Sequence, residues 1–108
     1  MILYEAGWER SGLDISFSKA ATAACVGAER AIASAEERLA KRYNERLALA
    51  IDRVYELVAS LSDRLGDIAA AAELAPNLHD DERKEAGARR TYHLLLLSTG
   101  LLLALNAE

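Results

Sequence analysis

The sequence predicts an all-α protein. Its 22 alanines and 18 leucines account for 40 of the 108 residues, and both are strong helix formers. Residues that break helices are rare, because Pro76 is the only proline and no glycine lies between Gly27 and Gly66. From Cys25 to Ala72, apolar side chains recur with a mean spacing of about 3.6 residues, the repeat of an α-helix. We therefore expect a single all-helical domain over residues 1–108.

Residues 1–12 hold two large aromatic side chains and precede the long helical pattern. We interpret this stretch as an N-terminal arm or a short helix, followed by a helical region over residues 14–75. Tyr4 and Trp8 are candidate partner-binding residues, because aromatic side chains often anchor protein interfaces. The alternative is that they cover the end of their own bundle.

Residues 16–75 are expected to form one long amphipathic helix or two nearly collinear helices within an elongated bundle. From Leu47 to Ala72 the apolar spacing alternates between 4 and 3 residues, as in a heptad pattern, and an irregularity near Tyr43 joins this half to the preceding one. The i,i+4 order of Glu37 and Lys41 favours a helix that continues past this point. A bend or loop near Asn44 is the alternative.

The charged residues opposite this apolar stripe, among them Asp52, Arg53 and Glu56, are interpreted as a solvated face. The helix should end near Ala75, because a proline disfavours helical geometry in the residue before it.

A last helix is expected over residues 80–106, antiparallel to the stripe of residues 47–72. Its second half is apolar on every side, and a helix of that kind must be surrounded. Two other helices in so short a chain cannot cover all of it, so we expect a homo-oligomer, most simply a dimer. The candidate oligomer interface consists of Leu94, Leu95, Leu97, Leu101, Leu102 and Leu105.

The same C-terminal segment carries an alternative interpretation as a membrane anchor. Residues 91–107 reach the lower end of the length that spans a bilayer, and Arg89 and Arg90 would mark a cytoplasmic flank. Polar residues within the segment, such as His93 and Asn106, weigh against it because they are costly in lipid.

The charge balance disfavours nucleic acid as a partner. The formal net charge is −4, and duplex binding normally rests on a basic face that contacts several phosphates. Arg83, Lys84, Arg89 and Arg90 form the one local basic group. Its three arginines are candidate partner-binding residues, with a helical nucleic-acid binder as a less favoured alternative. Interleaved acids such as Glu85 favour ordinary surface pairing.

No motif for catalysis, metal or cofactor binding is found in the sequence. Cys25 sits among apolar residues, which is typical of a buried, unreactive thiol. His79 lies beside Asp80 and Asp81, a combination that we interpret as a helix start rather than a metal site. We therefore expect no enzymatic activity, no cofactor and no bound metal.

Taken together, these features predict a non-enzymatic protein–protein interaction protein, such as a small adaptor, regulator or inhibitor that binds a larger protein partner. A phage or mobile-element origin would suit such a protein. The single cysteine and the lack of a signal-peptide pattern near Met1 favour the cytoplasm.

Overall fold

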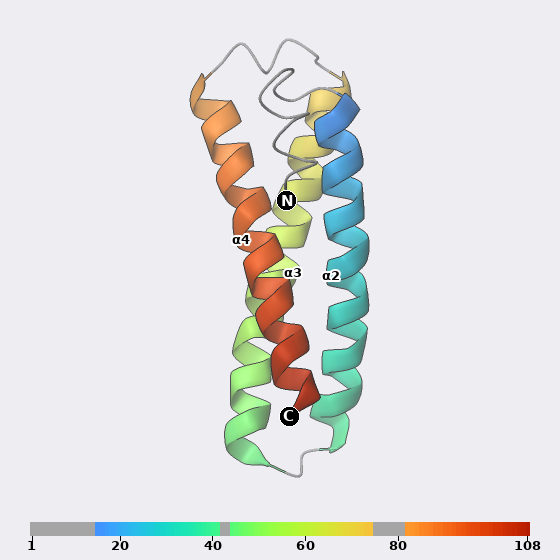
Figure 1. Cartoon of the computed structure of the whole chain (residues 1–108), viewed down its shortest axis with the longest axis vertical. Helices are drawn as coiled ribbons and strands as arrows, with labels where there is room; N and C mark the ends of the chain where they lie inside the picture. Colours follow the sequence, from blue (N-terminus) through green and yellow to red (C-terminus); the bar gives the residue numbers. More distant parts are fainter. Residues whose placement is uncertain (1–14, 42–43, 75–81) are drawn as a thin grey trace.

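The described part of the chain forms three antiparallel helices. The computed structural model describes residues 15–41, 44–74 and 82–108. These contain α2 (Ile15–Lys41), α3 (Glu45–Leu74) and α4 (Glu82–Ala107). Successive helices run in opposite directions, so α2 and α4 point the same way (Figure 1). The described residues confirm the all-α prediction, whereas Tyr4, Trp8 and the expected arm over 1–12 lie outside them.

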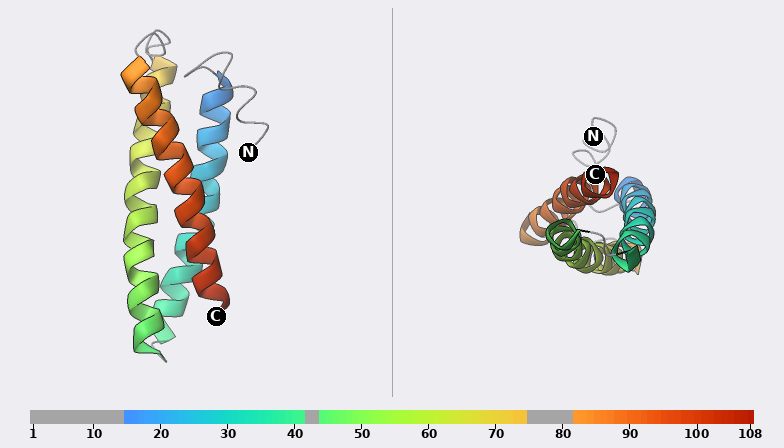
Figure 2. Two further views of the ribbon diagram at one scale, coloured as in Figure 1. Left: turned by 60° about the vertical axis from the view of Figure 1, so that its left-hand side comes forward. Right: turned by 90° about the horizontal axis from the view of Figure 1, so that it is seen from below.

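The expectation of one long helix, or of two collinear ones, over residues 16–75 is wrong. A continuous helix of that length would measure about 90 Å, whereas the longest dimension of the protein is 49 Å. Instead, α2 and α3 lie side by side and meet at a reversal between Lys41 and Glu45 (Figures 1 and 2). The reversal allows the apolar stripes of the two halves to cover each other, whereas in a straight helix the stripe of the first half would not be covered by the second.

Asn44 provides the local reason for a helix that begins at this point. Its side-chain Oδ1 accepts a hydrogen bond from the backbone N–H of Leu47 at 3.1 Å. Its backbone carbonyl accepts the first helical bond, from the N–H of Ala48, at 2.8 Å. This is the geometry of an N-cap, for which asparagine is among the most favoured residues.

Replacing Asn44 with alanine should therefore lower the free energy of unfolding by about 1 kcal/mol. Asn44→Asp should retain most of the stability, because aspartate caps a helix as well as asparagine does. Urea unfolding followed by circular dichroism measures both variants. If the helix instead ran through this point, Asn44→Ala would raise the stability, because alanine is the better residue in a helix interior.

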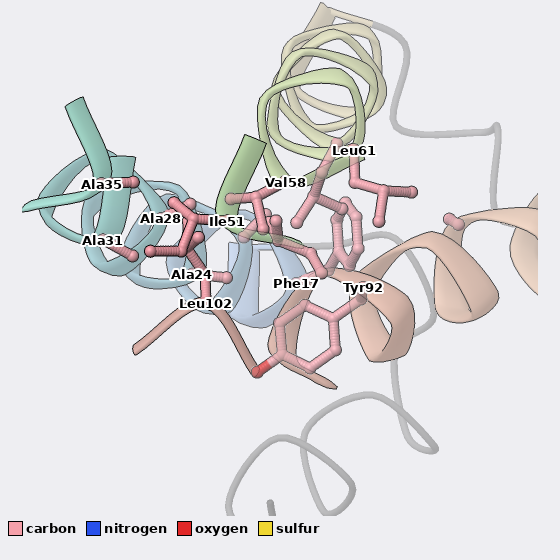
Figure 3. Packing of buried hydrophobic residues seen from close by; sticks show 14 residues of the cluster. Phe17, Ala24, Ala28, Ala31, Ala35, Ile51, Val58, Leu61, Tyr92 and Leu102 are labelled. Atoms are coloured by element: carbon pink, nitrogen blue, oxygen red, sulfur yellow. The ribbon is translucent and has the colours of Figure 1, made fainter. Parts of the chain in front are cut away.

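The core lies along the bundle axis and draws on all three helices. On α2 the fully buried apolar residues are one aromatic residue followed by a run of alanines, namely Phe17, Ala21, Ala24, Ala28, Ala31 and Ala35. They face larger side chains of the other helices, which include Ile51, Val58, Leu61 and Leu65 of α3 and Tyr92, Leu95 and Leu102 of α4 (Figure 3). The centre of the α2 face is thus made of alanine, whereas Cys25, Ile32 and Leu39 of the expected stripe are only partly buried.

The α4 helix leans away from α2 towards its first residue and approaches α2 towards its last (Figures 1 and 2). The two large aromatic side chains of the core, Phe17 and Tyr92, point into the same part of the interior (Figure 3). On α2, the large Phe17 therefore lies where α4 diverges from it, and alanines line α2 where the two helices converge, as dense packing requires.

Candidate functional site

The leucine-rich half of α4 is divided between the core and the surface. Leu95 and Leu102 are fully buried within the chain, and Leu105 packs partly against the core. In contrast, the exposed fractions of Leu94, Leu97 and Leu101 are 45%, 72% and 51%. Of the six leucines expected at an oligomer interface, only these last three offer a substantial surface to a second molecule.

Leu94, Leu97, Leu101 and Ala104 lie on one side of α4, because their spacing of 3, 4 and 3 residues follows the helical repeat. All four are exposed, and we call them the outer face of α4. No aspartate, glutamate, lysine or arginine occurs anywhere between residues 91 and 107. The outer face is therefore an apolar surface with no charged side chain to solvate it.

The outer sides of α2 and α3 differ from this face because they are rich in exposed charges. Exposed acidic and basic residues occur along both helices, at Glu29, Arg30, Glu36 and Glu37 of α2 and at Asp52, Arg53, Glu56, Asp63, Arg64 and Asp67 of α3. The interpretation of these charges as a solvated face is thereby confirmed. Two exposed leucines of α3, Leu49 and Leu57, are separated along the helix by three of these charges.

Two polar residues of α4 point inwards instead, and their hydroxyl groups are satisfied by their own helix. Thr91 donates to the carbonyl of Gly87 at 2.9 Å. Ser98 donates to the carbonyl of Leu94 at 2.6 Å. Such bonds to the carbonyl four residues earlier let small polar side chains enter a core. These hydroxyls are part of the packing and offer no chemistry to a ligand.

Within the basic group at the start of α4, Arg89 is paired with an acidic side chain. The Arg89 Nη2 atom lies 3.3 Å from a carboxylate oxygen of Glu85, one turn earlier on the same helix. Arg90 is exposed, and the side chain of Arg83 lies outside the described ones. The Arg89–Glu85 pair agrees with ordinary surface pairing, which contributes little to stability.

A cavity of about 370 Å³ opens between the C-terminal ends of α2 and α4 and is lined by Ser34, Glu37, Arg38, Lys41, Leu103, Asn106 and Ala107. The Arg38 guanidinium donates to the Asn106 backbone carbonyl at 3.0 Å, where a cation complements the negative end of α4. Lys41 lies 4.0 Å from Glu37 in an exposed ion pair. Arg38 thus links the two helix ends, whereas Lys41 and Glu37 pair with each other within α2.

The remaining reactive side chains are dispersed. Cys25 is half-buried and its thiol lies 3.5 Å from the Ser62 carbonyl, at the contact between α2 and α3. His93 stacks edge-on against Tyr92, with ring centroids 6.2 Å apart. Across the described ranges, no three histidine, cysteine, aspartate or glutamate side chains gather as metal ligands, and His79, Asp80 and Asp81 fall outside those ranges.

Comparisons of the chain with protein-family models, with curated proteins and with solved structures found no match. Within residues 15–41, 44–74 and 82–108, no helix combines the length and the apolar content that crossing a membrane requires. The candidate functional site is therefore defined by the surface of this chain itself, and the outer face of α4 is its most distinctive part.

Proposed function

We propose that this chain is a non-enzymatic interaction protein that binds a larger protein partner through the outer face of α4. The observation that carries the proposal is the 72% exposure of Leu97 at the centre of an apolar, charge-free helix face. Water-exposed leucines at helical spacing are the surface that an amphipathic helix of another protein would cover. An adaptor, regulator or inhibitor of the cytoplasm would act in this way, by bridging or occluding its target.

The expected gain on binding follows from the area of leucine that leaves water. Fully burying an exposed leucine is worth about 1.5–3 kcal/mol. Leu94, Leu97 and Leu101 are already about half covered on average, so each would contribute about 1 kcal/mol or slightly more. Since association also costs translational and rotational freedom, this face suits a partner that adds polar contacts at the rim.

The test compares two exposed leucines in the cells that naturally make the protein. The full-length chain carrying a tag is isolated after brief cross-linking as wild type, as Leu97→Glu and as Leu49→Glu, and the bound proteins are quantified. We expect a partner whose recovery falls about tenfold or more with Leu97→Glu, because a charge enters an apolar contact. Leu49→Glu is the control, since Leu49 is also exposed, at 52% against 72% for Leu97, but lies among the charges of α3.

Direct binding of that partner, purified, to both variants completes the test, and circular dichroism checks that the variants remain helical. Equal recovery of every bound protein with the two variants would contradict the proposal.

A further inference from the structure

The outer face of α4 continues at both ends into charged residues of opposite sign. Arg90 lies four residues before Leu94, and Glu108 lies four residues after Ala104. Both are exposed. Glu108 follows the last residue of α4 and stays close to the helix, because its backbone N–H donates to the Leu105 carbonyl at 3.3 Å. The outer stripe therefore reads, in order, one cation, three leucines, one alanine and one anion.

This order is self-complementary when two copies of α4 lie antiparallel. With Leu97 opposite Leu101 of a second copy, Leu94 falls opposite Ala104 and Arg90 falls opposite Glu108. The spacing of 4, 3, 4, 3 and 4 residues places all these pairs in successive layers of a heptad seam. The dimer then has two-fold symmetry, so each contact occurs twice: Leu97 of the first copy contacts Leu101 of the second, and Leu101 of the first contacts Leu97 of the second.

The charges select the antiparallel direction. A parallel pairing would put Arg90 against Arg90 and Glu108 against Glu108, and like charges placed opposite each other oppose association. The antiparallel pairing puts an arginine against a carboxylate at both ends of the apolar layers. Charge and apolar spacing thus agree on one register.

We propose that, in the absence of its partner, the outer face of α4 binds a second copy of this chain in this antiparallel register. The inference rests on the proposed function, since it names a second occupant of the same face. Dimerisation and partner binding are then mutually exclusive, and the dimer keeps the leucines of the unoccupied protein out of water.

The size of the contact sets the expected affinity. From residue 90 to residue 108 the stripe is about 27 Å long, and it is about one helix diameter, 10 Å, wide. This footprint, about 270 Å² on each copy, is smaller than that of a standard specific interface and suits a weak, transient contact. We therefore expect a dissociation constant on the order of 100 μM, which a larger partner surface would readily overcome.

Disulfide trapping tests the register on the full chain with Cys25 replaced by serine. One preparation carries Leu94→Cys and a second carries Ala104→Cys. We expect the mixture to form disulfide-linked heterodimers about tenfold faster than either preparation forms homodimers. In the proposed register residues 94 and 104 lie opposite each other, whereas the two copies of residue 94 are separated by about 15 Å along the axis. Faster linking of each variant to itself would overturn the antiparallel register.

Sedimentation velocity without added cysteines tests the dimer itself. We expect a monomer–dimer equilibrium that Leu97→Glu weakens about tenfold or more and Leu49→Glu leaves unchanged. Arg90→Glu should weaken the dimer, and the exchanged pair Arg90→Glu/Glu108→Arg should restore it. A monomer up to submillimolar concentration overturns the dimer but leaves the partner proposal standing. Conversely, a dimer combined with equal partner recovery by both leucine variants overturns the partner proposal alone.

Discussion

Leu95→Ala should lower the free energy of unfolding by about 2–5 kcal/mol, whereas Leu97→Ala should change it by less than about 0.5 kcal/mol. The two residues are of the same type, lie two positions apart on α4 and lose the same three carbon atoms. Leu95 is fully buried in the core, whereas 72% of Leu97 is exposed, the largest fraction among the exposed large apolar residues of the described part of the chain. Only the first substitution leaves a cavity, so the difference measures how α4 is rotated in the bundle.

Urea unfolding below the dimer range, followed by circular dichroism, gives both values. The dependence of the unfolding free energy on urea should stay the same in the two variants, because the surface exposed on unfolding hardly changes. Equal losses for the two alanine variants would mean that α4 presents a different face to α2 and α3.

The rotation of α4 was not predictable from the spacing of its leucines. Four consecutive leucines, Leu94 to Leu97, point in directions about 100° apart and so surround the helix. Any rotation would bury some of them. The distinguishing signal lies in the small polar residues Thr91 and Ser98, which are seven residues apart and share the buried side. Each tolerates burial because its hydroxyl bonds to its own helix. A rule that places polar residues on the surface would wrongly turn Thr91 and Ser98 towards solvent and so predict the wrong rotation of α4.

The exposed leucines of α4 were predictable only as a class, within the candidate oligomer interface. The sequence indicated that the C-terminal helix carries more apolar surface than the bundle can cover, and the exposure of Leu94, Leu97 and Leu101 bears this out. It did not separate them from Leu95 and Leu102. Likewise, the sequence placed Arg89 among partner-binding candidates, whereas the structure pairs it with Glu85.

The regular spacing of the apolar residues concealed the chain reversal at Asn44. A stripe with a mean repeat of about 3.6 residues is compatible with one helix or with two helices that each have their own buried face. Asn44, the capping residue, was the one turn-tolerant residue at this point of the sequence, and the irregularity near Tyr43 marked the same place. Tertiary packing favours two antiparallel helices over one continuous helix, because an apolar stripe stabilises a helix only when another element buries it.

The alanine run of α2 sets how closely the three helices approach one another. Ala21, Ala24, Ala28, Ala31 and Ala35 are all almost completely buried, and a side chain of one methyl group lets the facing helix come near. Side chains at the contact determine the distance between helix axes within about 8–10 Å. We expect the bundle to lie at the short end of this range along α2. Larger apolar residues at these positions would bury more hydrophobic surface, but the space between α2 and its neighbours is too narrow for them.

Ala28→Leu should therefore destabilise the protein by about 1–3 kcal/mol, although it adds apolar surface at a core position. The three added carbon atoms have no space, since Ala28 is fully buried, and they would force α2 away from α3 and α4. Ala33→Leu is the matched control, because Ala33 is exposed on the same helix and its substitution should change stability by less than about 0.5 kcal/mol. Thermal unfolding of both variants makes the comparison. A gain in stability for Ala28→Leu would mean that the core is loosely packed around α2, and that hydrophobic area rather than fit limits the stability of this bundle.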